Sequence, residues 1–177
     1  MHDYIIQALH GDHNAFGRVY DTYAASALRL SMSITRDSAL AQDAVQEAFL
    51  RVYRKGRQFR QNEAFEPWFY RIVINESKRV LKQRPHEPAL NDFMSVSSFT
   101  DQGDSLVNIT AAMATLSEEH RTVLTLKFVL DHSEAAIAGI IKKPLGTVKS
   151  RIHYAKKSLA LQLGRVEEPA SAEKINS

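Results

Sequence analysis

The sequence predicts an all-α protein made of two small helical domains joined by a flexible acidic linker. Helical periodicity of the apolar residues dominates both halves of the 177-residue chain, which contains only 7 glycines and 5 prolines. Residues 85–110 interrupt this periodicity with prolines, serines and acidic side chains, and no Lys or Arg occurs between residues 85 and 114. The hydrophobic fraction of 44% is that of a folded protein, and the length suits one medium domain or two small ones.

The interruption sets the domain boundaries. We place the N-terminal domain at residues 1–84, the linker at 85–110, the C-terminal domain at 111–163 and a disordered tail at 164–177. Apolar spacing and capping residues predict the helices on either side of the linker. They are expected at about 2–10, 13–34, 38–55, 65–83, 105–115, 117–130, 133–141 and 147–163.

Composition excludes several classes of function. The chain has no cysteine, which excludes disulfides and Cys-ligated metal, and no further ligand cluster supports a metal site at His10 and His13. No Gly-rich phosphate loop or catalytic arrangement is found, so we expect neither an enzyme nor a bound cofactor, metal or small-molecule ligand. The N-terminus does not resemble a signal peptide and no apolar run could insert into a membrane, which predicts a cytoplasmic protein.

Charge along the chain is separated into blocks of one sign. Residues 51–60 carry five basic side chains and no acidic one, and residues 142–158 carry six basic side chains and no acidic one. Blocks of this kind favour partners with phosphate groups or acidic surfaces.

Residues 133–159 have the pattern of a helix-turn-helix unit. Ser133 is a plausible N-cap, Pro144 ends the first helix, and Thr147 is expected to cap the second. Winding the second helix at about 100° per residue places Val148, Ile152, Ala155 and Leu159 on the inward stripe. A polar outer face with cations at its margins is either an ordinary solvated surface or a face that binds the major groove, and the one-signed charge favours the second.

Residues 116–159 resemble the region-4 (σ4) domain of bacterial sigma factors of the extracytoplasmic-function (ECF) type. The segments "LSEEHRTVLTLKF" and "GTVKSRIHYAKKSL" carry the resemblance. It implies that the second helix reads the −35 promoter element. The sequence departs from the family pattern at two positions, where Lys142 replaces a turn glycine and Ala136 replaces a Glu that is usual in the family. A left-handed Lys142 would cost about 1 kcal/mol. The residues expected at −35 DNA are Thr147, Lys149, Ser150, Arg151, His153, Tyr154, Lys156 and Lys157.

The predicted helix at 38–55 has two stripes. Leu40, Ala44, Ala48 and Val52 form the buried one, and a second stripe mixes acidic, basic and amide side chains with one leucine. Periodicity alone leaves open whether the second stripe is a docking surface or a solvated face. The segment "QDAVQEAFLRVYR" resembles the helix by which sigma factors grip the clamp helices of RNA polymerase. The matching residues are Asp43, Gln46, Glu47, Leu50 and Arg51.

The predicted helix at 65–83 combines buried aromatics with a polar stripe that suits an opened DNA strand. The alternative is that the cations are solvated, and we expect Trp68 mostly in the core. "WFYRIVIN" resembles the family's promoter-melting and −10-recognition helix, with Glu76 at a usually apolar position and Arg79 at a commonly acidic one. Together with the preceding loop, the residues expected at −10 DNA are Arg60, Asn62, Trp68, Arg71, Asn75, Lys78 and Lys82.

Both resemblances together imply a σ2-like bundle and a σ4-like helix-turn-helix domain in one sigma factor. Such a protein binds core RNA polymerase, directs promoter-specific transcription initiation and is restrained by an anti-sigma protein. Two other readings stay open at this point. One is a stand-alone helix-turn-helix regulator, and the other is a protein that only sequesters polymerase or an anti-sigma protein.

Overall fold

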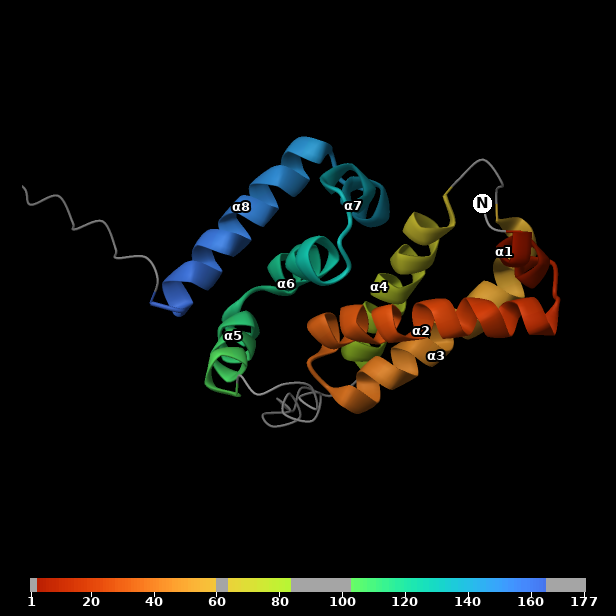
Figure 1. Ribbon diagram of the computed structural model, residues 1–177, viewed down its shortest axis with the longest axis horizontal. Coiled ribbons are helices and arrows are strands. Elements are labelled where there is room, and N and C mark those ends of the chain that lie inside the picture. The colour runs from red at the N-terminus through yellow and green to blue at the C-terminus, as the bar shows by residue number, and fades with distance from the viewer. Residues whose placement is uncertain (1–2, 60–63, 84–102, 165–177) are drawn as a thin grey trace, which may run out of the picture.

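The computed structural model describes residues 3–59, 64–83 and 103–164, and the regular elements within these ranges are helical (Figure 1). The predicted tail from residue 165, the linker as far as residue 102, and the loop residues Arg60 and Asn62 lie outside the described residues. The N-terminal half contains α1 (Asp3–Leu9), α2 (His13–Thr35), α3 (Ser38–Lys55), the 3-10 turn η1 (Gly56–Gln58) and α4 (Phe65–Gln83). The C-terminal half contains α5 (Gly103–Thr115), α6 (Glu118–Leu124), the π-helical turn η3 (Thr125–Val129), α7 (Glu134–Ile141) and α8 (Leu145–Gln162).

Aspartates fix the starts of the two long N-terminal helices. The Asp12 carboxylate accepts the Ala15 amide at 2.7 Å at the start of α2, and Asp37 accepts the Leu40 amide at 2.8 Å at the start of α3. Each aspartate thereby satisfies an amide that has no partner within its helix. Helices α2 and α3 pack against each other, with only Arg36 and Asp37 between them in the sequence.

The core of the N-terminal half is built around Phe69, which is fully buried on α4. Its ring lies 5.2 Å from that of Phe49 on α3 and 5.3 Å from that of Tyr23 on α2, measured between centroids. The predicted inward stripe of α3 is confirmed, because all four of its members are buried. Since two of them are alanines with no exposed area, α3 can approach its neighbours closely.

The helix-turn-helix unit forms α7 and α8. Ser133 caps α7 as predicted, accepting the Ala136 amide at 3.1 Å, and Lys142 adopts the left-handed conformation with φ of 52°. The predicted start of the second helix at Thr147 is wrong, because α8 begins at Leu145 with Pro144 in the N-cap position. Proline fixes its own φ and lacks an amide, so a helix can begin directly after it without a side-chain cap.

The helix predicted at about 105–115 is present as α5, which begins two residues earlier, so residues 103–110 belong to α5 and the end of the linker assigned at residue 110 is placed too late. The single helix expected at about 117–130 ends as an α-helix at Leu124 and continues as the π-helical turn η3.

The two halves pack against each other. Helix α6 contacts α2, and α7 contacts α4 (Figure 1). Buried residues of both halves belong to one continuous apolar cluster, which includes Phe69 from α4, Ile137 and Ile140 from α7, and Val148 from α8. In Figure 1, α8 lies on the side of the molecule away from α1 and α3. None of the helices in the described part of the chain combines the length and apolar character needed to cross a bilayer.

Candidate functional site

Helix α8 presents a polar face to solvent. Val148, Ile152 and Ala155 are buried against the rest of the C-terminal half, so the opposite side of the helix must point outward. Tyr154 is 58% exposed, and its ring lies edge-on to that of His153 at 5.5 Å between centroids. The other exposed side chains predicted to bind −35 DNA are Lys149, Ser150, Lys156 and Lys157.

Two residues of the predicted −35 set differ from this exposed group. Thr147 is half-buried in the first turn of α8. The Arg151 guanidinium lies 3.0 Å from the Glu119 carboxylate of α6, measured from Nη2 to Oε2, and only 22% of the Arg151 side chain is exposed. Arg151 is therefore already paired within the C-terminal half.

The side chains on the polar stripe of α4 fall into two groups, those exposed to solvent and those in contact with the C-terminal half. Asn75 and Lys82 are exposed, whereas Arg71 and Lys78 contact the C-terminal half. Arg71 Nη2 donates to the Gly139 carbonyl at 2.9 Å, and Lys78 Nζ lies 2.9 Å from Glu118 Oε1. Trp68 is half-buried and packs on Phe59 and Phe65, which agrees in part with its predicted place in the core.

A cleft of about 320 Å³ lies where α4 faces the C-terminal half. Cationic side chains from both halves line it, together with two glutamates of α6. From α4 come Arg71, Asn75 and Lys78, and from the C-terminal half come Glu118, Glu119, Lys142, Lys143 and Arg151.

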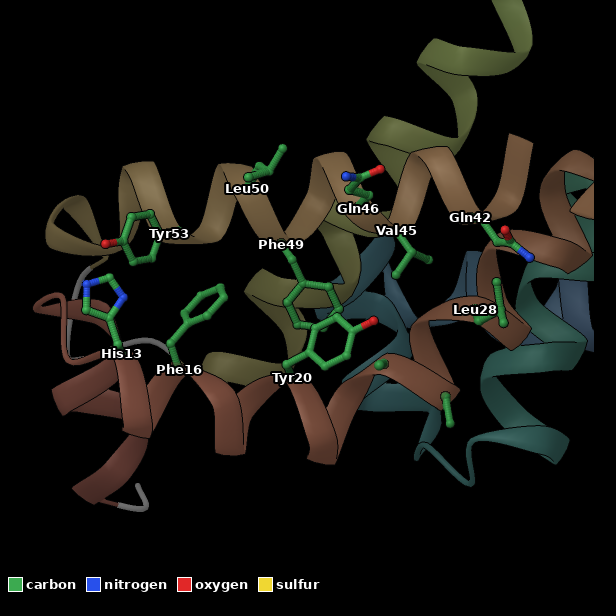
Figure 2. A pocket seen from close by; sticks show the side chains of 12 residues that line it. His13, Phe16, Tyr20, Leu28, Gln42, Val45, Gln46, Phe49, Leu50 and Tyr53 are labelled. Carbon is green, nitrogen blue, oxygen red and sulfur yellow. The ribbon is translucent and has the colours of Figure 1, made fainter. Parts of the chain in front are cut away.

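Two of the five predicted polymerase-binding residues of α3 line a groove of about 820 Å³ between α2 and α3 (Figure 2). Figure 2 shows the rings of Phe16 and Tyr20 on α2 facing Phe49 and Tyr53 on α3. Tyr20 and Phe49 lie 4.8 Å apart between centroids. Gln46 and Leu50 line the groove, while Asp43 is exposed on the same helix outside its lining.

Glu76 has a role that sequence reasoning missed. Its side chain is only 1% exposed, and its two carboxylate oxygens meet Arg51 Nε at 2.9 Å and Arg79 Nε at 2.6 Å. Arg79 also lies 3.7 Å from Glu47. Arg51 is thus tied to α4, and Glu76 and Arg79, the two departures from the family pattern, compensate each other. The paired departures were the signal that could have predicted this contact.

Arg121 and His132 are also residues that the sequence did not single out. Arg121, on α6, is buried and donates to the carbonyls of Ser33 at the end of α2 and of Leu116. Burial is the main cause that lowers the Arg121 pKa from its ordinary value. Arg121 lies within the segment "LSEEHRTVLTLKF" that carries the family resemblance, and this was the signal that could have singled it out, whereas His132 lies outside both quoted segments.

His132 packs against α4 at the boundary between the halves. Its ring lies edge-on to Tyr70 at 5.1 Å between centroids, and its Nε2 atom is buried without a hydrogen-bond partner among the described residues. Burial lowers the His132 pKa, and the nearby carboxylates of Glu66 and Asp131 oppose the shift only in part. The neutral imidazole is therefore the form that fits this packing.

Comparison with known proteins identifies the family. The model of "Sigma-70 region 2" matches residues 19–86 and that of "Sigma-70, region 4" matches residues 106–159, which together make up more than half of the chain. The ECF RNA polymerase sigma factor SigW of Bacillus subtilis is 31% identical over 176 residues, covering 90% of this chain and 94% of SigW. The chain is an ECF-type sigma factor of the sigma-70 family.

Two solved structures share the fold of this sigma factor. CnrH in complex with the cytosolic domain of CnrY has a TM-score of 0.73 at 19% identity, covering 93% of this chain and 97% of CnrH. RpoE of Bartonella quintana, in complex with the anti-sigma factor NepR, has a TM-score of 0.67 at 19% identity, covering 85% of this chain and 99% of RpoE.

A sigma factor is a non-catalytic subunit that binds core RNA polymerase and promoter DNA and directs transcription initiation. This family membership agrees with the function predicted from the sequence.

Proposed function

We propose that this sigma factor divides initiation among three helical surfaces. The outer stripe of α3 docks on core polymerase, the polar stripe of α4 holds the opened −10 region, and the outer face of α8 binds the −35 duplex. The exposure of α8 is the observation that carries the proposal, because it combines a buried apolar stripe with an open face of hydrogen-bonding groups and cations.

The −35 role rests on the chemistry of the α8 face. A major groove about 12 Å wide admits one α-helix, whose central side chains reach base edges while those at its margins meet the phosphates. Ser150, His153, Tyr154 and Lys157 occupy the centre of the exposed face, and Lys149 and Lys156 flank it. Hydrogen-bonding groups thus face the bases and cations face the backbone.

The polymerase role rests on the groove between α2 and α3. An amphipathic helix binds by laying its apolar face into such a groove and its polar side chains along the rim. Tyr20 and Leu50 supply exposed apolar surface, Gln46 a hydrogen-bonding rim, and Asp43 a charge beyond it. This arrangement supports docking of a helical element of polymerase along α3.

The −10 role rests on the exposed members of α4. Asn75 and Lys82 supply an amide and a cation about two turns apart, which suits a single strand whose bases and phosphates are both accessible. Arg71 and Lys78 extend the same stripe and join the −10 surface once their contacts with the C-terminal half are released.

We also propose that the protein acts in the cytoplasm, where it meets core polymerase, and that an anti-sigma protein restrains it. The structurally similar RpoE was solved in complex with an anti-sigma factor, which supports the second part. The exposed cations of α4 and α8 offer such a protein a surface to cover.

Run-off transcription tests the proposal. The purified chain and bacterial core polymerase are incubated with a pool of templates that are randomised upstream of a fixed transcript. The proposal predicts transcripts only when both proteins are present, initiating from a subset of templates that share two upstream elements. Specific duplex binding by the chain alone, with no transcription, would instead support a stand-alone regulator.

A further inference from the structure

The cleft between α4 and the C-terminal half carries an excess of positive charge. Five cationic side chains and two glutamates line its volume of about 320 Å³, which gives its walls a formal net charge of +3. The buried side chains of Ile74 and Ile140 belong to the same lining. Apolar walls of low dielectric constant focus the field of the charges around them, so an anion inside this cleft is attracted more strongly than one on an open surface.

The two glutamates of the cleft are already neutralised. Glu118 Oε1 lies 2.9 Å from Lys78 Nζ, and Glu119 Oε2 lies 3.0 Å from Arg151 Nη2. Each glutamate therefore balances one of the five cations. The positive excess belongs to the other three cations of the lining.

These three cations are Arg71, Lys142 and Lys143. Both lysines are exposed, and neither forms an ion pair with a carboxylate of the described residues. Arg71 donates through Nη2 to the Gly139 carbonyl at 2.9 Å and through Nε to the Ile140 carbonyl at 3.4 Å. These contacts leave three of the five N–H donors of its guanidinium for another acceptor.

The end of α7 does not account for three cations. A helix C-terminus carries about half a unit of negative charge, and one basic side chain in or after the last turn is enough to offset it. Arg71 already contacts the last carbonyls of α7 directly. The charges of Lys142 and Lys143 are therefore in excess of what the helix end requires.

Lys142 holds its place at the cleft in a strained backbone conformation. Its φ of 52° lies in the left-handed region, which favours glycine because a side chain there crowds the backbone. Backbone strain of this kind persists mainly where the side chain is needed at that position. Since Lys142 lines the cleft, its strained backbone places a cation at the cleft wall where a glycine would place none.

The volume and charge of the cleft select the class of ligand. At about 320 Å³ the cleft lies at the low end of the range of about 300–1,000 Å³ for small-molecule sites, which suits a small ligand and not a folded partner. Phosphate groups combine negative charge with several acceptor oxygens, and Arg and Lys are the side chains that bind them best. A chain of phosphates can meet three cations at once, whereas a single phosphate meets fewer.

We propose that this cleft binds a small polyanion with several linked phosphate groups, either inorganic polyphosphate or the polyphosphate of a nucleotide, through Arg71, Lys142 and Lys143. The site goes beyond the surfaces proposed for polymerase and promoter DNA, and binding of the anion does not require either partner. Arg71 also belongs to the polar stripe of α4, so the anion and an opened DNA strand compete for its guanidinium.

Calorimetric titration of the full chain with inorganic triphosphate tests the site. At about 0.15 M salt, where long-range attraction is screened, one triphosphate should bind per chain, at least about tenfold more tightly than inorganic phosphate. Titration with GTP separates the two sources of the ligand. Tighter binding of GTP than of triphosphate would assign the site to nucleotides, weaker binding would assign it to inorganic polyphosphate, and both results support it.

Two lysine variants and one control locate the binding. Lys142→Gly removes a cation and relieves the left-handed strain, so the variant stays folded, and Lys143→Gln removes a cation at an exposed position. Each should weaken triphosphate binding by about tenfold or more. Lys55→Gln, at an exposed position of α3 outside the cleft lining, should leave the affinity unchanged. No binding to the wild-type chain, or equal losses in all three variants, would overturn the proposal.

Acetylation of lysines, followed by mass spectrometry, tests the same site in the unmodified chain. Triphosphate should slow the acetylation of Lys142 and Lys143 severalfold and leave that of Lys55 unchanged. Equal protection of all three lysines would overturn the proposal, as would stronger protection by a hexaglutamate peptide, which would indicate an acidic protein partner. Neither measurement uses polymerase or DNA, so this site and the promoter roles of α4 and α8 are tested separately.

Discussion

Replacing Arg121 with methionine should destabilise the chain by about 3 kcal/mol. Arg121 is 7% exposed and donates to the carbonyls of Ser33 and Leu116, with a longer contact of 3.4 Å to Ile34. Methionine fills the space of the apolar stem but donates no hydrogen bond. Each of the two well-bonded carbonyls then loses a buried donor at about 2 kcal/mol, and relief from burying the guanidinium returns about 1 kcal/mol.

Urea unfolding followed by circular dichroism measures this loss. At about 2–4 °C per kcal/mol for a chain of this size, the melting temperature should also fall by about 6–12 °C. Arg57→Met is the matched control, because Arg57 is exposed in η1 and its replacement should change stability by no more than about 0.5 kcal/mol. An Arg121→Met chain within about 1 kcal/mol of the wild type would refute the claim that this arginine caps buried carbonyls.

Three further predictions concern the functional surfaces and the boundary between the halves. Leu50→Ala should weaken binding to core polymerase by about five- to thirtyfold, measured by an anisotropy titration. Leu81→Ala is the control, because Leu81 is equally 37% exposed but lies on α4, and equal effects of the two substitutions would contradict docking along α3. The free energy of unfolding should decrease as the pH falls below about 6.5, because burial lowers the His132 pKa and the unfolded chain then binds more protons than the folded one. Urea unfolding at several pH values measures this, and a decrease of the same size in His132→Gln would contradict it. In the complex with polymerase, Lys149→Ala should lower by about 1 the slope with which the logarithm of promoter affinity falls with the logarithm of salt concentration, without changing sequence preference. Gln162→Ala, at an exposed position farther along α8, should leave both the slope and the preference unchanged. A shift in sequence preference caused by Lys149→Ala would contradict a phosphate contact.

The sequence predicted the faces of α3 and α8 correctly because apolar spacing determines which side of a helix is buried. Val148, Ile152 and Ala155 are buried as the winding of α8 required, and Ser133 caps α7 as its side chain suggested. Lys142 adopts the left-handed conformation that its place at the turn demanded. Each of these outcomes depends on residues within a few positions of one another.

The contacts between the halves could not be predicted in the same way. Periodicity placed Arg71 and Lys78 on an outward stripe of α4, but it carries no information about which distant segment covers that stripe. Buried polar residues were missed for a related reason. Glu76 and Arg121 read as surface residues by type, and only their partners in space explain their burial.

The central claim is that α8 and α4 bind two separate promoter elements, the −35 duplex and the opened −10 region. Sequencing the transcribed templates from a pool randomised across both elements tests it most directly, with Lys157→Ala on α8 and Lys82→Ala on α4, both of which are exposed. The account predicts that Lys157→Ala flattens base preference at the −35 element alone and that Lys82→Ala reduces initiation or preference at the −10 element alone. Both variants acting on the same element, or neither changing the selected promoters, would contradict it.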